Sequence, residues 1–242
     1  MRSRAPAWLS SQPIAHRGLH DGERAENSLA AFEAAVEHGY AIELDVHHTR
    51  AGELLVFHDD DLARMTGEAG PVDALERGAS ADLRLRPGGE AVPTLAQALA
   101  HVRGRAPIVL DLKSKRRPGA LERAVAATIA GYRGALALQS YQPFALAELR
   151  RLAPERTRGL LVSDFRDAQL APHERFALAN ALLSPLARPH YVAWELRCLP
   201  SLPAGVLRRL GLPLIAWTIA DPAALARAHA VADNVIFEGV RP

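Results

Sequence analysis

The chain has 242 residues, of which 49% are hydrophobic and 23% are charged, and its net charge is +2. These proportions are ordinary for a globular protein, and no basic run is interleaved with aromatic residues, which argues against nucleic acid as the main partner. The apolar stretch LGLPLIAWTIA is far too short to cross a membrane, and the N-terminal stretch lacks the apolar core of a secretory signal. Cys198 is the single cysteine, so no intrachain disulfide can form, and we expect a cytoplasmic protein without stable membrane insertion.

Short apolar runs alternate with longer helical patterns along nearly the whole chain. Strands are expected at 13–16, 41–46, 54–58, 107–112, 135–140, 158–163, 191–195, 213–218 and 234–238. Helices are expected at 27–38, 94–103, 118–131, 143–152, 173–183, 202–210 and 222–230. The first of these helices would be capped by Asn27 or Ser28, and the last opens with Asp221 and Pro222, a capping residue followed by a first-turn proline.

One pair of strand candidates differs from the rest. Only residues 47–53 separate 41–46 from 54–58. A parallel crossover needs a dozen or more residues, so this pair is expected to form an antiparallel hairpin that turns at Ala51 and Gly52.

The remaining eight strand candidates are nearly all separated by helical patterns. Eight such units in a chain of this length predict a TIM (β/α)8 barrel with a β-hairpin extension after the second strand. A doubly wound open sheet is the alternative, but no Gly-x-Gly-x-x-Gly motif follows the first strand. We expect a single domain over 1–242, in which the glycine- and proline-containing region 59–92 forms a loop or lid insertion. The oligomeric state stays open.

Charged and histidine side chains gather at the ends of the first predicted strands. They are His16, Arg17, Glu43, Asp45, His58, Asp59, Asp111 and Lys113. Residues two apart lie on the same side of a strand, as Glu43 and Asp45 do. Charges on parallel strands, which are buried on both faces, are costly unless they meet a partner. In a barrel these ends meet at one mouth, where catalytic residues lie.

Glu43, Asp45 and Asp111 offer three carboxylates from two neighbouring strands. All-oxygen ligands suit Mg²⁺ or Ca²⁺ better than zinc. Buried salt bridges to Arg17 and Lys113 are the competing interpretation, but three converging carboxylates with two histidines nearby favour a metal site.

The basic residues contain a second signal. Arginine supplies 27 of the 29 cations, and the two lysines, Lys113 and Lys115, lie in one segment. A lysine in a chain that otherwise uses arginine suggests that Lys113 has a specific role.

Several motifs in this order resemble those of the glycerophosphodiester phosphodiesterases. They are HRG, ENS, AAFEAAVEHG, IELDV, T-x-x-G, HDDDLARMTG, VPTL, LDLK and AWT, and they cover nearly the whole chain, most densely over 14–67. The combination of HRG, E-x-D-V and HD at these separations is specific, although each piece alone is weak. The resemblance implies a phosphoric diester hydrolase that needs a divalent metal cation and acts on a small glycerophosphodiester.

The resemblance also implies roles for individual residues. His16 and His58 look like the catalytic pair that acts as general acid and base. The metal ligands would be Glu43 and Asp45, with Asp111 in the place of the third. The phosphate and substrate contacts would come from Arg17 of HRG, from Lys113, and from Trp217 of AWT, which could equally pack inside the barrel.

Three positions depart from the family pattern. At 111 the family usually has glutamate, so Asp111 is one methylene shorter. After AWT the family usually has asparagine where Ala220 stands, and the last strand usually closes on Thr-Asp, where this chain has Phe237 and Glu238. These changes bear on the substrate more than on the reaction class.

The residue types suit hydrolysis of a phosphodiester to glycerol 3-phosphate and an alcohol. Arg17, Lys113 and the cation would neutralise charge in the transition state. One histidine would deprotonate the nucleophile, either water or the substrate's own neighbouring hydroxyl, and the other would protonate the leaving alkoxide. A lysophospholipase D-type activity on lysophospholipids and a catalytically silent binding barrel are the alternatives. Without an apolar amphipathic stretch at the mouth, we expect a hydrophilic substrate such as glycerophosphocholine.

The remaining histidines are given no catalytic role. We expect His20, His47 and His48 in loops or at the surface, and His38 at a helix C-terminus. Cys198 is expected to pack rather than react.

Overall fold

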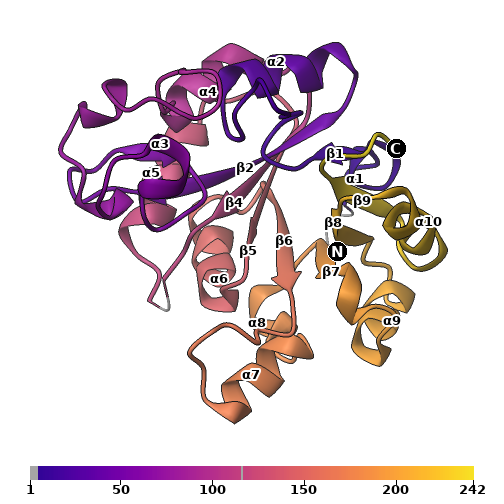
Figure 1. Ribbon diagram of the computed structural model, residues 1–242. Coiled ribbons are helices and arrows are strands. Elements are labelled where there is room, and N and C mark those ends of the chain that lie inside the picture. Colours follow the sequence, from indigo (N-terminus) through magenta and orange to yellow (C-terminus); the bar gives the residue numbers. More distant parts are fainter. Residues whose placement is uncertain (1–4, 116) are drawn as a thin grey trace.

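The computed structural model describes residues 5–115 and 117–242, in which eight parallel strands close into a barrel. These strands are β1 (Ile14–Ala15), β2 (Ala41–His48), β4 (Ile108–Leu112), β5 (Leu136–Ser140), β6 (Thr157–Val162), β7 (Tyr191–Glu195), β8 (Leu214–Ile219) and β9 (Asn234–Phe237). Ile14 of β1 pairs with Ala41 on one side and with Ile236 on the other, which closes the barrel. The helices surround the strands (Figure 1). The predicted barrel is therefore confirmed; residues 1–4 and 116 of the predicted domain 1–242 lie outside the described residues.

The predicted hairpin is also confirmed. The strand β3 (Leu54–Val56) runs antiparallel to β2, with His48 opposite Leu54 and Val46 opposite Val56. Gly52 in the turn has φ of +87°, a conformation that glycine adopts without steric cost. Because β3 pairs outside the barrel, β2 extends beyond its parallel neighbours and carries the strand to His48.

The helices follow the predicted ranges closely. The longer ones are α2 (Leu29–Glu37), α4 (Leu95–Val102), α5 (Ala120–Ile129), α6 (Pro143–Leu152), α7 (Pro172–Ala179), α9 (Leu202–Arg209) and α10 (Pro222–Val231). Of the two predicted caps for α2, Ser28 is the one used, because its hydroxyl accepts a hydrogen bond from the Ala31 N–H at 3.1 Å. Asp221 caps α10 through the Ala224 N–H at 2.7 Å. Among the described residues, no helix is long and apolar enough to cross a membrane.

The single helix predicted over 173–183 is wrong in its extent. The chain forms α7 and then a separate short helix, α8 (Ser184–Ala187). Ala181 between them has φ of +52°, which interrupts the helical backbone, and Pro185 lies in the first turn of α8, where a missing N–H costs nothing.

Apolar residues fill the barrel on both sides of its strands. The inner cluster includes Ile14, Val109, Tyr191 and Ile215, all essentially inaccessible to solvent. A short helix that the sequence did not predict, α1 (Trp8–Ser11), adds Leu9 to this cluster. The Asn234 side-chain amide donates to the Leu9 carbonyl at 3.0 Å, which ties α1 to the start of β9. The amino-terminal end of the barrel is therefore closed, and the mouth at the carboxyl ends of the strands is left for chemistry.

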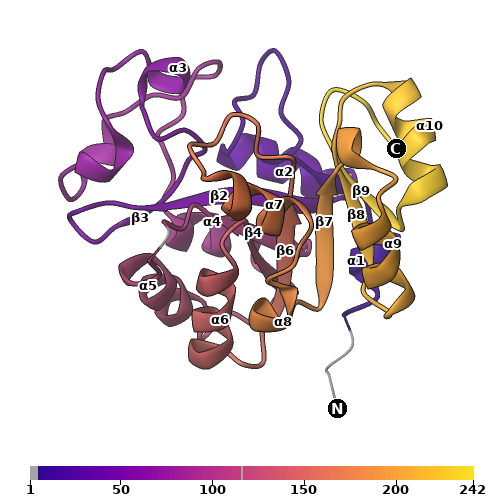
Figure 2. The ribbon, with the colours of Figure 1, turned by 90° about the horizontal axis from the view of Figure 1, so that it is seen from below.

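Residues 59–92 form a structured insertion with an apolar cluster of its own. The segment contains the short helix α3 (Ala63–Thr66) and two 3-10 turns. Leu62, Met65, Val72 and Leu85 pack with residues of the hairpin and form a cluster separate from the barrel core. Figure 2 shows α3 and its flanking loops on the opposite side of the β2–β3 hairpin from α5. The insertion therefore begins next to the barrel mouth, directly after His58.

Candidate active site

The three predicted metal-binding carboxylates come together at the ends of two neighbouring strands. Asp45 of β2 lies directly opposite Asp111 of β4 in the sheet register, and Glu43 precedes Asp45 by two residues on the same face. One oxygen from each of Glu43, Asp45 and Asp111 lies within 4.8 Å of the others, and all three side chains are buried. Strand pairing thus brings together residues that are nearly 70 positions apart in sequence.

Lys113 lies among these carboxylates, as its position two residues after Asp111 predicts. Its Nζ is 2.7 Å from an Asp45 oxygen and 2.8 Å from an Asp111 oxygen. Burial alone would lower the pKa of Lys113, but the two aspartates raise it above its ordinary value, so the side chain is an ammonium. One positive charge is therefore shared between two buried acids.

The carboxylates differ in how readily they ionise. Burial and the charges of Asp45 and Asp111 raise the pKa of Glu43 well above its ordinary value. Burial also raises the pKa of Asp111, against the opposing effect of Lys113. For Asp45 the effect of burial is outweighed by Lys113 and other neighbouring cations, which hold its pKa below the ordinary range. Burial and mutual repulsion therefore disfavour full ionisation of the three acids, and a bound cation would relieve this effect.

The cluster has the properties of a site for a hard cation. It offers carboxylate oxygens from three buried residues, and Asp111 Oδ1 is buried without a hydrogen-bond partner. An unpaired buried carboxylate oxygen is costly, and a divalent cation would satisfy it. The residues therefore fit Mg²⁺ or Ca²⁺ by ligand chemistry.

His16 directly follows β1 and is held in place by Glu238, which directly follows the last strand, β9. Its Nδ1 donates to Glu238 Oε2 at 2.7 Å, so in the neutral ring Nε2 is the free acceptor. The hydrogen bond from His16, together with the nearby His20, lowers the pKa of Glu238 below its ordinary range. In the sequence, Glu238 stood out only as a difference from the family pattern. Its contact with His16 was not predicted. His20, expected at the surface, lies 3.8 Å from the same carboxylate.

His58 is held in the same way by its own sequence neighbour. Its Nδ1 donates to Asp59 Oδ1 at 2.6 Å, which again leaves Nε2 as the acceptor. Burial and the nearby Lys113 lower the pKa of His58, in opposition to the carboxylates. Both predicted catalytic histidines thus have an orienting carboxylate and a free second nitrogen.

Arg17 is anchored through its backbone and its side chain. Its N–H donates to Glu43 Oε2 at 3.0 Å, and its Nη1 donates to Glu26 at 2.7 Å. Arg17 has φ of +55° and is followed by Gly18, where an added Cβ would lie 2.9 Å from Ala31 and Phe32. Gly18 therefore lets the loop approach α2 closely enough to place Arg17 beside the acids.

Two neighbours of this loop were contained in the ENS motif but were given no role. Glu26 holds Arg17, and the Asn27 side-chain amide donates to Asp45 at 2.8 Å. Asn27 has φ of +58° and is buried. Neither contact follows from spacing, because the loop has to fold back across β2 to make it.

Two aromatic side chains form one wall of the barrel mouth. The predicted substrate-binding residue Trp217 packs edge-to-face against Tyr141, with ring centroids 5.9 Å apart. The Trp217 indole N–H is buried without a hydrogen-bond partner. A cavity of about 120 Å³ lies between this wall and the polar groups, and its lining includes His16, Arg17, Glu43, Asp45, His58, Asp111, Lys113 and Trp217. All eight predicted site residues therefore line one cavity.

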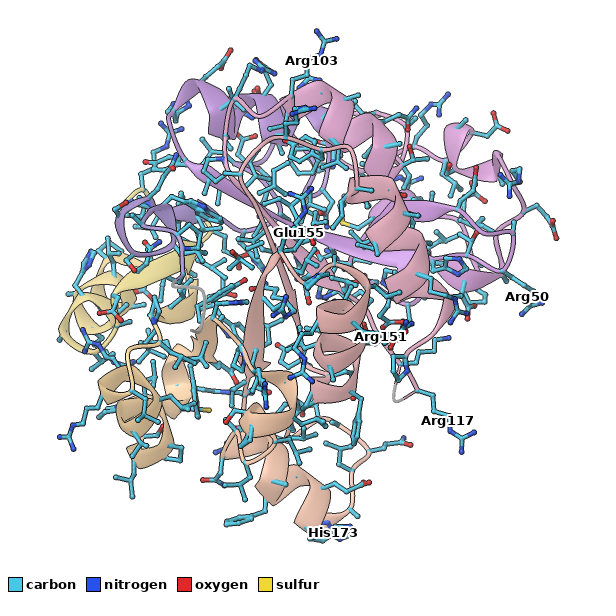
Figure 3. The ribbon with its side chains drawn as sticks, turned by 180° about the vertical axis from the view of Figure 1, so that it is seen from behind. Arg50, Arg103, Arg117, Arg151, Glu155 and His173 are labelled. Carbon is cyan, nitrogen blue, oxygen red and sulfur yellow. The ribbon has the colours of Figure 1, made fainter. Side chains whose placement is uncertain are left out.

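Two further cavities adjoin the mouth. One of about 470 Å³ shares Lys113 with the site and is lined mainly by polar residues, among them Glu122, Arg50 and Arg117. Figure 3 shows Arg50 and Arg117 at the outer edge of the molecule. The other, of about 260 Å³, is lined largely by apolar residues that include Phe144, Leu170 and Leu178. It lies at the start of α6 and along α7, and therefore on the mouth side of β5 and β6.

One expectation about the nearby histidines is wrong, because His47 lies neither in a loop nor at the surface. His47 and His48 belong to β2 rather than to a loop, because pairing with β3 lengthens that strand. His47 is buried, and its Nε2 donates to the His58 carbonyl at 3.0 Å. Lys115, two residues after Lys113, pairs with Asp73 of the insertion, and its Nζ lies 2.8 Å from that carboxylate.

The chain is similar to known proteins both in sequence and in fold. A model of the glycerophosphoryl diester phosphodiesterase family matches residues 16–238. A glycerophosphodiester phosphodiesterase of Caldanaerobacter subterraneus subsp. tengcongensis is 29% identical over 218 residues, covering 85% of this chain and 84% of that protein. A human lysophospholipase D is 47% identical over 58 residues, or 24% of this chain and 18% of that protein. An Oleispira antarctica phosphodiesterase, solved with the product sn-glycerol-3-phosphate, has a TM-score of 0.77 at 24% identity and covers 93% of this chain and 92% of that one.

Proposed function

Because the chain belongs to the glycerophosphoryl diester phosphodiesterase family and is thus a phosphoric diester hydrolase, we propose that its barrel mouth cleaves small glycerophosphodiesters in a metal-dependent reaction. The products are glycerol 3-phosphate and an alcohol. The bond between phosphorus and the alcohol oxygen breaks, and a new bond to the nucleophile's oxygen forms. Water, or the substrate's neighbouring hydroxyl followed by water, supplies that oxygen.

One observation carries this proposal above the others. Three buried carboxylates and two histidines line a single cavity of about 120 Å³. Each histidine is oriented by a further carboxylate, Glu238 for His16 and Asp59 for His58. A structural salt-bridge cluster has no need of two histidines with free nitrogens on the same cavity. The combination is what a metal-assisted acid–base reaction requires.

Glu43, Asp45 and Asp111 are proposed to hold the cation, Mg²⁺ or Ca²⁺. When bound, the cation polarises the phosphoryl group and neutralises charge that develops on its oxygens. Lys113 remains beside Asp45 and Asp111, where its ammonium can also face a phosphate oxygen. Arg17, fixed by Glu43 and Glu26, presents its guanidinium to the same anion.

His16 and His58 are proposed to move the protons. Glu238 and Asp59 fix the two rings so that Nε2 is the reactive nitrogen of each. One histidine accepts the proton of the nucleophile, and the other, protonated, donates to the leaving alkoxide. Trp217 and Tyr141 supply an apolar wall for the glycerol carbons, and the unpartnered Trp217 N–H can donate to a hydroxyl.

A lysophospholipase D activity is the second candidate, and one observation favours it. The expectation that the mouth lacks apolar surface does not hold near α7, because the cavity of about 260 Å³ is largely apolar and Phe176 of that helix is 64% exposed. An acyl chain could pack there. Most residues that line the larger cavity beside Lys113 are charged or polar, however, and these suit a hydrated head group.

A direct comparison of substrates tests the proposal. Purified protein is supplied with glycerophosphocholine or lysophosphatidylcholine, and the release of choline is measured with and without EDTA. We expect EDTA-sensitive release from glycerophosphocholine and little from the lysophospholipid. The reverse preference would support the second candidate, and no release from either would point to a silent binding barrel.

The lysine positions give a sharper test of the site. Lys113→Arg is expected to keep the charge but lose most of the activity, because a planar guanidinium is too wide to replace a compact ammonium between Asp45 and Asp111. Lys115→Arg is the matched control and is expected to be silent, since Lys115 is exposed and contacts Asp73. The measurement is kcat/KM at saturating Mg²⁺, with melting curves for both variants. Near-wild-type rates for both variants would show that charge alone matters at 113.

A further inference from the structure

A single arginine of the insertion contacts two carboxylates that belong to different parts of the site. Arg64 of α3 donates through Nε and Nη2 to the two oxygens of Asp59, at 2.6 and 3.0 Å. It also donates through Nη1 and Nη2 to the two oxygens of Glu26, at 2.9 and 2.7 Å. Its guanidinium therefore holds both acids in bidentate pairs, which fix geometry as well as charge.

Each of these acids in turn holds a residue that faces the cavity. Asp59 accepts the Nδ1 hydrogen of His58 at 2.6 Å, and Glu26 accepts a hydrogen bond from Arg17 at 2.7 Å. The contacts form a continuous chain from His58 through Asp59, Arg64 and Glu26 to Arg17. We propose that Arg64 is a positioning residue, which sets the orientation of the proton-transfer group His58 and of the phosphate-binding group Arg17 together.

The burial and charge of the two acids support this role. The Glu26 side chain is 12% exposed, and its hydrogen bonds to Arg64 and Arg17 hold its pKa below the ordinary value against the effect of burial. The hydrogen bonds from Arg64 are the largest cause that lowers the pKa of Asp59 to about 2. Without Arg64, each carboxylate keeps only its contact to the site residue and can rotate together with it. A displacement of about 1 Å in a reacting group can cost about a hundredfold in rate.

The chain offers a closely matched ion pair that touches no site residue. Arg105 forms a bidentate pair with Glu33 at 2.6 Å for both bonds, far from the mouth. The Arg105 side chain is 43% exposed, and that of Arg64 is 49% exposed. Arg64→Ala removes two bidentate pairs and Arg105→Ala removes one, both from partly exposed guanidinium groups, so the melting temperatures of the two variants are compared as well. Where both variants remain folded at the assay temperature, a difference in activity between them reports on the site.

The experiment compares Arg64→Ala, Arg64→Lys and Arg105→Ala with the unmodified protein. The measurements are kcat and KM on glycerophosphocholine at saturating Mg²⁺, the Kd of sn-glycerol 3-phosphate, and melting temperature. We expect Arg64→Ala to lower kcat/KM by about tenfold to a hundredfold, through a lower kcat from His58 and weaker product binding from Arg17. Arg64→Lys should recover only part of this loss, because an ammonium cannot hold two carboxylates at both of their oxygens. Arg105→Ala should leave kcat/KM within about twofold.

A double-mutant cycle connects the effect to Asp59. In an Asp59→Ala background, the further change Arg64→Ala should cost less kcat than it does alone, because the route to His58 is already broken. Equal losses of activity in Arg64→Ala and Arg105→Ala, or full additivity in the cycle, would overturn the inference. The inference rests on the proposed roles of His58 and Arg17, and the two can be told apart. If the unmodified protein is inactive, the proposed function is contradicted. If the unmodified protein is active and Arg64→Ala leaves kcat/KM unchanged, only the positioning role is contradicted.

Discussion

Removal of divalent cations is expected to abolish the hydrolysis of glycerophosphocholine, and Mg²⁺, Mn²⁺ or Ca²⁺ is expected to restore it. The reason is that Glu43, Asp45 and Asp111 crowd three acids around one ammonium, and Asp111 Oδ1 has no hydrogen-bond partner. Burial and the neighbouring carboxylates raise the pKa of Glu43 and of Asp111, which disfavours their ionised forms, and a bound cation would stabilise those forms. The measurement is the initial rate after exhaustive chelation, followed by titration with each metal.

Binding can be followed independently of activity. A cation that binds the folded protein raises its melting temperature, by an amount equivalent to about 2.7 kcal/mol at a hundred times its Kd. Asp111→Asn should weaken this response, and Asp73→Asn, an acid of the insertion that pairs with Lys115, should leave it unchanged. Full activity of metal-free protein would contradict the assignment of all three ligands.

The second large effect is expected from the two histidines. His16→Ala and His58→Ala should each lower kcat by roughly a hundredfold or more, since general acid–base catalysis contributes about 10²–10⁴ to rate. Metal affinity should change little, because neither ring belongs to the carboxylate cluster. The measurement is kcat at saturating Mg²⁺ and substrate, together with the metal-dependent shift in melting temperature.

His48→Ala is the appropriate control for this pair. His48 lies on the same strand as the acids but lines the adjoining polar cavity, whose lining does not include His58. His47 is a poorer control, because it is buried and donates to the His58 carbonyl, so its loss would disturb the backbone beside the site. If His48→Ala proved as damaging as His58→Ala, the acid–base pair would have been placed on the wrong side of the hairpin.

Much of the fold could be predicted because its signals are local. The runs that form β4 and β5 are short, apolar and bounded by helical patterns, and both strands lie within one residue of their predicted ranges. The hairpin followed from connection length alone. The exception was also local in origin. The helix α7 ends early because Ala181 adopts a positive φ, and an alanine gives no sign in the sequence of that conformation.

The site residues could be predicted where charged side chains occur at alternating positions along a strand. Alternation on β2 and β4 was enough to bring Glu43, Asp45, Asp111 and Lys113 to one face, because side chains two apart point the same way and parallel neighbours align. Because an isolated charge inside a barrel is energetically costly, several buried charges at one place indicate a functional site.

The tertiary structure alone decided which groups orient the reactive ones. His16 meets Glu238, 222 residues away, only because β1 pairs with β9 when the barrel closes. Arg64 reaches Glu26, 38 residues away, only because the insertion folds back over the mouth. Such contacts depend on the register of strand closure and on the path of loops, which periodicity does not encode. The sequence by itself therefore determined the barrel and the residues at its mouth, and the closed fold determined the partners that hold them in place.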